Sequence, residues 1–324
     1  MAKLYCIGEA LIDFIPVSAG SEQAGQAARE GWLAPMPGGA TANTAVAAAK
    51  LGAATAFIGM VGDDGFGRML FDVMGGYGVD TALMGRTAKA CTTMAFVTLA
   101  PDGDREFTFA RKPGADMLLS EADIPDGIFS AGDILHLGTI GLAPGGSTKA
   151  AHLKAVSDAR SAGALISYDP NIRLPLWDSE EVLRETALEF LPFSDILKVS
   201  ADEMPFIFGT DDERAAAEYS FGKGVSVFFV TRGRDGAAVY TPGFSASEEG
   251  LMVRAVDTTG AGDAFNGAFL SRFLGRPLEE SLLPDALGDT LRFANAAGAV
   301  TVTRKGAMAG SPTPEEIEVF VSAV

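Results

Sequence analysis

Asp263 follows two glycines in the segment 257–265 (DTTGAGDAF), which joins an apolar run to a helical pattern. Glycines at such a turn let successive backbone N–H groups converge on an anion at the positive end of a helix dipole. A carboxylate beside such a turn suits a base that takes a proton from a hydroxyl while the turn holds a phosphoryl group in transfer. The segment alone also fits a helix-capping Asp after a glycine turn.

The segment differs from two common nucleotide-binding motifs. Phe265 stands where a dinucleotide fingerprint has its third glycine, and Asp263 would repel a resting pyrophosphate. The chain has no Gly-Lys-Ser or Gly-Lys-Thr, which excludes a Walker loop. A dehydrogenase that uses NAD is disfavoured, because no Gly-x-Gly-x-x-Gly follows the first apolar run.

A second glycine pair, Gly38 and Gly39, opens an Ala-rich helical pattern that contains Asn43. The glycines allow a ligand to approach the backbone, and the amide of Asn43 both donates and accepts hydrogen bonds. Asp13 follows the first predicted strand, where open α/β sheets bind ligands, and its carboxylate suits sugar hydroxyls. Taken singly, these features also fit a tightly packed helix start and a solvated loop.

Short apolar runs alternate with amphipathic helical patterns, which predicts an α/β fold with a mostly parallel sheet covered by helices on both faces. A capping box at 313–316 predicts the start of the last helix, and other helices are predicted at 147–162 and 181–191. Strands are predicted at 4–7, 56–61, 134–137, 164–168, 196–199, 227–231 and 237–240, and 251–256 is strand-like.

Two segments interrupt this alternation. Residues 14–37 are rich in Ser, Gly, Gln and Pro, and residues 92–111 predict a hairpin with its turn at 101–104. In the second strand of this hairpin, Phe107, Phe109 and Arg111 share one face. An apolar face ending in a cation suits a flap over a polar ligand, and an edge hairpin with scattered aromatic residues fits equally well.

The composition restricts the function class. The 324 residues carry a formal net charge of −17, which argues against a nucleic-acid partner but leaves a nucleotide substrate open. Two cysteines, Cys6 and Cys91, exclude a disulfide framework, and His136 and His152 are expected in the core or on the surface rather than at a metal. Without an apolar run of about 18 residues or a signal-peptide core, we expect a soluble cytoplasmic protein with no membrane partner.

Together these segments resemble the ribokinase-like (PfkB) carbohydrate kinase family over essentially the whole chain. The resemblance rests on 38–43 (GGATAN) with the trailing segment 59–67, and on 257–263. It is most similar to the fructokinases, through the strings at 105–116, 167–177 and 291–295. It implies one three-layer kinase domain over residues 1–324, with a small β-sheet lid from about 14–37 and 92–111.

The resemblance also implies roles for individual residues. Asp263 would deprotonate the sugar's primary hydroxyl, and the amides of Gly260, Ala261 and Gly262 would form the anion hole. The sugar would contact Asp13, Gly38, Gly39, Asn43 and Asp263, with Arg111 reaching in from the lid. ATP would contact Ser200, Thr231, Gly233, Gly236, Gly262 and Asn295; phosphates and Mg²⁺ would be organised by Asp169, Asn171, Arg173 and Glu203; and K⁺ would lie near Asp257, Thr259, Thr301, Arg304 and Gly306.

The implied reaction is phosphorylation of D-fructose to fructose 6-phosphate by ATP. Alternatives are a kinase for another sugar or sugar acid (2-keto-3-deoxygluconate, ribose or tagatose), since Arg111 suits a ketose hydroxyl and a carboxylate, and a non-catalytic sugar or nucleotide sensor. The retained Asp263 argues against the sensor.

Ser200 departs from the Asn that many relatives have three residues before the acid at Glu203, which leaves the nucleotide contact open. Lid sheets of this family often pair, so a homodimer through the lid is one expected assembly.

Overall fold

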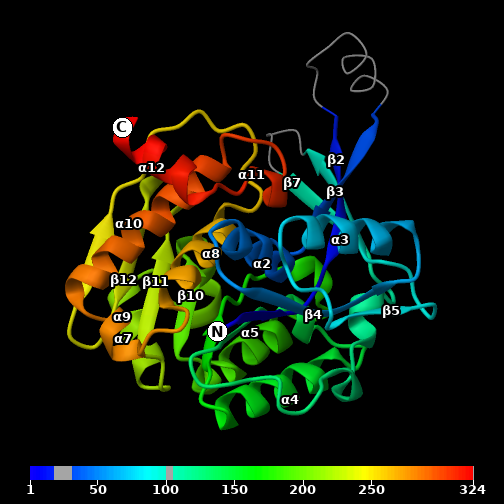
Figure 1. The fold of residues 1–324 in the computed structure, drawn as a ribbon, viewed down its shortest axis with the longest axis horizontal. Helices are drawn as coiled ribbons and strands as arrows, with labels where there is room; N and C mark the ends of the chain where they lie inside the picture. The colour runs from blue at the N-terminus through cyan, green and yellow to red at the C-terminus, as the bar shows by residue number, and fades with distance from the viewer. Residues whose placement is uncertain (18–30, 100–104, 324) are drawn as a thin grey trace.

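The structure is a computed structural model that describes residues 1–17, 31–99 and 105–323. Its centre is a nine-stranded sheet in the order β13-β12-β11-β10-β9-β8-β1-β4-β5 (Figure 1). The strands from β5 to β11 in this order pair in parallel, whereas β12 and β13 are antiparallel. The bounds are β1 Leu4–Ile7, β4 Thr55–Gly62, β5 Met84–Thr87, β8 Ile134–Leu137, β9 Leu165–Tyr168, β10 Ile196–Ser200, β11 Val227–Thr231, β12 Ala237–Tyr240 and β13 Ser245–Glu248.

Helices cover both faces of this sheet because its central strands are apolar on both faces. All four residues of β1 are buried, and they alternate between two cores: Leu4 and Cys6 belong to one, Tyr5 and Ile7 to the other. The first core is closed by α2 Ala40–Lys50, α3 Gly65–Gly76, α8 Ala261–Phe273, α9 Leu278–Ser281, α10 Pro284–Thr301, α11 Ala307–Gly310 and α12 Pro314–Ala323. The second is closed by α4 Thr148–Ser161, α5 Glu180–Glu189, α6 Met204–Phe208 and α7 Glu213–Phe221.

A separate four-stranded sheet, called the small sheet below, projects from one end of the molecule (Figure 1). Its strands, in the order β3-β2-β6-β7, are β2 Leu11–Pro16, β3 Leu33–Gly38, β6 Met94–Leu99 and β7 Arg105–Ala110. The β6–β7 hairpin matches the prediction, and its turn at 101–104 lies outside the described residues. Gly8, Glu9 and Ala10 alone separate β1 from β2, so the chain passes directly from one sheet to the other.

Two sequence predictions need correction. The strand-like run 251–256 has no regular secondary structure and pairs with none of the described strands, and Met252 and Val256 are 92% and 52% exposed. The backbone N–H of Val256 instead donates to the carbonyl of Val302 at 2.7 Å. The helix predicted at 181–191 ends at Glu189, because Pro192 lies in a following 3₁₀ turn.

The predictions for the start of the last helix and for the two histidines are confirmed. The last helix begins with the predicted capping box, in which the Thr313 N–H donates to Glu316 Oε2 at 2.9 Å. His136, His152 and Cys6 are buried core residues. Over the described part of the chain, no helix is both long and apolar enough to cross a membrane.

Candidate active site

Residues predicted to contact the nucleotide and its phosphates lie at the carboxyl ends of adjacent parallel strands. Asp169 comes directly after β9, and Ser200 and Thr231 end β10 and β11, where they lie opposite each other in register. Parallel strands end at one edge of a sheet, which is where open α/β folds bind ligands. The start of α8 reaches the same edge, since a Cβ added to Gly262 would lie 3.2 Å from the Nζ of Lys198.

The first turn of α8 is built around glycine. Gly260, the N-cap, has a φ of +82°, and a Cβ there would contact the backbone of Ala307. The first amides of a helix have no intrahelical acceptor, and they lie at the positive end of its dipole. The turn from Gly260 to Gly262 is therefore able to bind an anion.

Asp263, in this turn, is held by a residue 220 positions away. Asn43, buried on α2, donates from Nδ2 to Asp263 Oδ2 at 2.8 Å. Burial raises the pKa of Asp263 to about 6 and the charge of Asp169 adds to this, while the Asn43 bond, Lys198 and Arg173 oppose it. A pKa near the working pH suits a general base. The buried Oδ1 of Asn43 has no hydrogen-bond partner within the described chain, so it can accept a ligand hydroxyl.

Lys198 is a site residue that the sequence analysis missed. Its side chain is 8% exposed, and its Nζ lies 3.0 Å from Asp169 Oδ2, which also accepts from Asn266 Nδ2 at 2.7 Å. Burial lowers the pKa of Lys198, but Asp169, Glu203 and Asp263 outweigh burial, so the pKa lies above its ordinary value and the ammonium stays charged. The signal was present: Lys198 is the one charged residue in the apolar run 196–199, and a buried Lys needs a partner.

Two carboxylates fix the loops on the phosphate side. Glu203 accepts from the N–H of Ile172 at 2.6 Å through Oε1 and from the N–H of Ser200 at 3.0 Å through Oε2. Asp169 Oδ1 accepts from the N–H of Asn171 at 3.1 Å, and Asn171 has a φ of +45°. No group of three His, Cys, Asp or Glu side chains in the described residues could hold a metal. Mg²⁺ usually takes one or two carboxylates with phosphates and water, so this pair fits an ion that arrives with a nucleotide.

Three of the residues predicted to contact ATP, Gly233, Gly236 and Asn295, lie around the β11–β12 turn. Gly233 and Gly236 have φ values of +57° and +96°, and a Cβ on Gly236 would contact the carbonyl of Glu248. Asn295, on α10, donates from Nδ2 to the carbonyl of Glu249 at 2.8 Å. The turn, the end of β13 and α10 therefore meet, which places Asn295 beside this turn.

The predicted sugar contacts lie at the base of the small sheet. Asp13 is on β2 and Gly38 ends β3, and a Cβ on Gly38 would contact Asp13 Oδ2. Gly39 then leads into α2 and Asn43. The structure thus brings Asp13, Gly38 and Gly39 together at the start of α2, the helix whose Asn43 donates to Asp263.

Arg111 is held by partners within the protein. It follows β7, is 5% exposed, and its Nε lies 2.8 Å from Asp116 Oδ2. Its Nη2 donates to the carbonyl of Ile140 at 2.8 Å. These two bonds fix the guanidinium against the body of the protein, because a buried charge needs a partner. A role for Arg111 in sugar binding stays a prediction.

The predicted cation-binding positions form two adjoining loops. Asp257 Oδ1 and Oδ2 accept from the N–H groups of Thr259 and Gly306, each at 3.0 Å. The hydroxyl of Thr301 donates to the carbonyl of Ala297, and the guanidinium of Arg304 pairs with Glu316 at 2.8 Å. A guanidinium cannot ligate a cation, so the ligands that these loops could offer are oxygens: backbone carbonyls, the hydroxyl of Thr301 and the carboxylate of Asp257.

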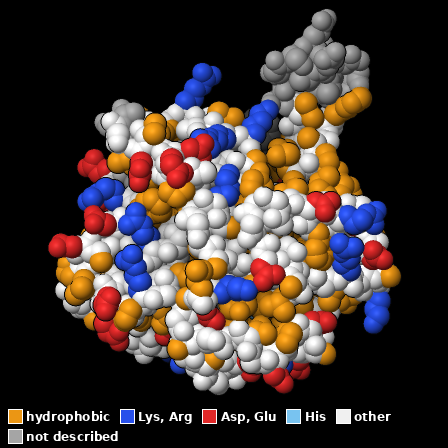
Figure 2. Space-filling model, in the orientation of Figure 1, with side chains coloured by type: hydrophobic (Ala, Val, Ile, Leu, Met, Phe, Trp, Pro, Cys, Tyr) orange, Lys and Arg blue, Asp and Glu red, His pale blue; other side chains and the backbone are white. Residues whose placement is uncertain are grey.

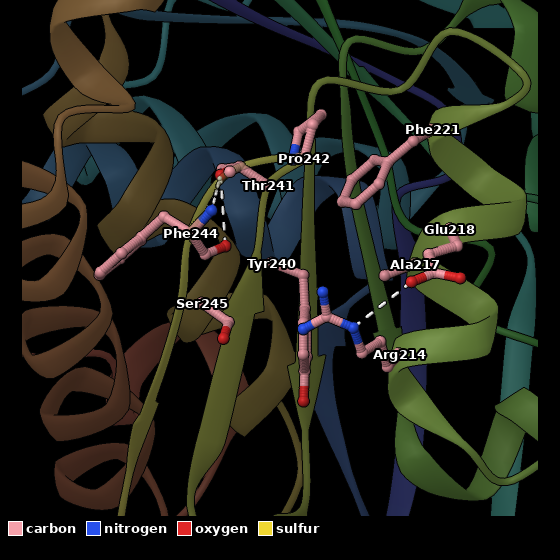
Figure 3. A pocket seen from close by; sticks show the side chains of 10 residues that line it. Arg214, Ala217, Glu218, Phe221, Tyr240, Thr241, Pro242, Phe244 and Ser245 are labelled. Carbon is pink, nitrogen blue, oxygen red and sulfur yellow. Dashed lines mark hydrogen bonds and ion pairs between the residues drawn. The ribbon is translucent and has the colours of Figure 1, made fainter.

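A cavity of about 200 Å³ lies elsewhere, between α7 and the β12–β13 turn (Figure 3). Tyr240, in its wall, pairs with Phe228 at the amino end of β11, whereas Thr231 ends that strand at the candidate site. An exposed pair, Arg214 and Glu218, borders the cavity at 3.3 Å. The cavity is therefore separate from the candidate site.

Comparison with known proteins identifies the family. The family model "pfkB family carbohydrate kinase" matches residues 1–314. A probable fructokinase-7 of Arabidopsis thaliana is 41% identical, with 98% of this chain and 92% of that protein covered. A fructokinase of Vibrio cholerae O395, crystallised with fructose, ADP and calcium, has a TM-score of 0.88 at 32% identity, with 99% of each chain covered.

A third relative shows that the fold serves other sugars as well. Aminoimidazole riboside kinase from Salmonella enterica, complexed with aminoimidazole riboside and an ATP analogue, has a TM-score of 0.84 at 31% identity, with 99% of each chain covered. The match over nearly the whole chain, together with the ribokinase-like architecture, places this protein in the pfkB family of carbohydrate kinases, as an ATP-dependent sugar kinase.

Proposed function

We propose that this chain transfers the γ-phosphoryl group of ATP to the primary hydroxyl on C6 of D-fructose, giving fructose 6-phosphate and ADP. The observation that carries the mechanism is the Asn43–Asp263 pair in the first turn of α8, at the edge of the sheet. The choice of fructose is supported by the fructokinases among the relatives.

Asp263 acts as the base. It takes the proton of the attacking hydroxyl, whose oxygen then bonds to the γ-phosphorus as the bond to the β,γ-bridging oxygen breaks. Asn43 orients the carboxylate of Asp263, and its hydrogen bond favours the ionised form. The Oδ1 of Asn43 accepts a hydrogen bond from the sugar. The pKa of about 6 leaves Asp263 mostly ionised at neutral pH, yet basic enough to accept a proton.

Hydrogen-bond donors of this chain stabilise the negative charge that develops on the transferred phosphoryl group. The amides of Gly260, Ala261 and Gly262 form the anion hole, and the Lys198 ammonium beside Gly262 adds a positive charge. Asp169 and Glu203 supply carboxylates for Mg²⁺, which when bound with ATP neutralises phosphate charge. Ser200, Thr231, Gly233, Gly236 and Asn295 hold the nucleotide.

The small sheet acts as a lid over the sugar. Water competes with the sugar for the phosphoryl group, so closure over Asp13 and Gly38 would favour transfer to the sugar. Its edge strands β3 and β7 expose backbone groups that a second copy can pair with, and hydrophobic side chains gather at its base (Figure 2). We therefore infer that the small sheet also forms a homodimer interface. Separately, we propose that K⁺ binds the two loops that Asp257 joins through the N–H groups of Thr259 and Gly306.

The test is ADP release with Mg-ATP across fructose, tagatose, ribose, glucose, 2-keto-3-deoxygluconate and aminoimidazole riboside. The highest kcat/KM on fructose, with fructose 6-phosphate as product, supports the proposal. A higher value on another sugar keeps the base and the anion hole but rejects fructose. ATP binding without turnover on any member would favour a sensor.

A further inference from the structure

Glu9 is a buried carboxylate that none of the roles above uses. It lies in the three-residue connection between β1 and β2 and is 1% exposed. Its Oε1 accepts from the backbone N–H of Ala40, the first residue of α2, at 2.7 Å. Its backbone carbonyl accepts from the hydroxyl of Thr41 at 3.3 Å. Glu9 therefore contacts the start of α2 through both its side chain and its backbone.

The start of α2 cannot cap itself. Its N-cap is Gly39, which has no side chain to accept from the first amides. Glycine is required at this position, because the φ is +106° and a Cβ would contact the carbonyl of Glu9. Glu9 thus supplies, from 31 positions earlier, the acceptor that the N-cap lacks.

The same helix start carries the sugar side of the site. Gly38 and Gly39 precede Ala40, and Asn43 follows three residues later with its bond to Asp263. We propose that Glu9 is a positioning residue for the acceptor sugar: by capping α2 it fixes the backbone of Gly38 and Gly39 and the direction of Asn43. This proposal rests on the proposed sugar-kinase function.

The surroundings of Glu9 contain two other charges, Arg111 and Asp116, which form an ion pair of their own at 2.6 Å. Burial raises the pKa of Glu9 to about 7, Asp116 adds to this, and Arg111 and the Ala40 amide oppose it. His152, which is also buried beside this pair, has a pKa lowered to about 4 by burial and stays neutral. The charge of Glu9 therefore changes near neutral pH.

The test compares Glu9→Ala, Glu9→Gln and Ser179→Ala, with Ser179 as the matched cap of α5, a helix that carries none of the site residues. Loss of an N-cap acceptor corresponds to about a tenfold change in an equilibrium. We expect Glu9→Ala to raise the KM for fructose about tenfold with the KM for ATP unchanged. Glu9→Gln, which keeps an acceptor oxygen, restores most of the affinity, and Ser179→Ala changes neither KM.

Two further readouts separate positioning from general damage. In Glu9→Ala, hydrogen exchange of the amides at 40–43 should accelerate while exchange in α5 does not. The small difference in the KM for fructose between the wild type and Glu9→Gln should shrink as the pH falls below 7, because protonated Glu9 and Gln both offer a neutral acceptor oxygen and the titration of Asp263 is common to both proteins. An unchanged KM for fructose in Glu9→Ala, or equal rises for both substrates, would overturn the proposal. A wild type inactive on every sugar would instead reject the proposed function, and the exchange result would still test the cap.

Discussion

Activity should fall at low pH as Asp263 becomes protonated, and this fall is called the acid limb below. Replacing Asn43 with Ala should move the acid limb to higher pH. The wild-type limb is expected at about 6, where Asp263 titrates. The Asn43 amide donates to the ionised carboxylate at 2.8 Å, and a hydrogen bond to a charged group is worth about 1.5–3 kcal/mol. At 1.36 kcal/mol per pKa unit, its loss raises the pKa by about one to two units. The limb therefore moves to between about pH 7 and pH 8.

The assay measures kcat/KM for fructose at saturating ATP from pH 5 to pH 9, which reports the groups of the enzyme before fructose binds, the state in which Asp263 has a pKa of about 6. Asn266→Ala is the matched control, because Asn266 donates the same amide group to Asp169 instead of Asp263. ATP itself also titrates in this pH range, but it does so equally in every assay, so a difference between the pH profiles of two variants does not come from ATP. The reasoning is refuted if Asn43→Ala leaves the limb near pH 6, or if Asn266→Ala moves it further than Asn43→Ala does.

Three other perturbations test separate parts of the account. Gly236→Ala should raise the KM for ATP with the KM for fructose unchanged, because φ is +96° and a Cβ would contact the Glu248 carbonyl; steady-state kinetics check this. Lys198→Met breaks a buried ion pair, which costs about 3–5 kcal/mol, so thermal unfolding should occur at a lower temperature. Because Lys198 lowers the pKa of Asp263, the acid limb should also move to higher pH. Burial raises the folded-state pKa values of Glu9 and Asp263 to about 7 and about 6. Their contribution to the free energy of unfolding is therefore complete below about pH 4 and is lost as the pH rises to about 7, so urea unfolding of Glu9→Gln and Asp263→Asn should show a flatter pH dependence.

Much of the main sheet was predictable from the sequence, because strands buried on both faces of a parallel sheet are continuous apolar runs. Residues 227–231 and 134–137 match β11 and β8 as predicted. The run 251–256 shows the limit of this signal. Its apolar residues predict a strand, but pairing depends on a free neighbouring edge, and the sequence contains no such information.

The candidate site was predictable where a local pattern carries the chemistry. The glycines at 260 and 262 mark the turn before Asp263, and the structure shows the positive φ at Gly260 that requires a glycine. Contacts between distant segments were not predictable. The Glu9 bond to Ala40 has no sequence pattern, because it depends on where two chain crossings between the sheets meet.

The most direct test of the central claim is the single-turnover rate of phosphoryl transfer from ATP to fructose by Asp263→Asn and by the wild type. The side chains have the same size, so the site keeps its shape and ATP should bind both proteins equally. With Asp263 as the base, the rate should fall by about 10²- to 10⁴-fold at unchanged ATP affinity. Transfer by Asp263→Asn within about threefold of the wild-type rate would contradict the account.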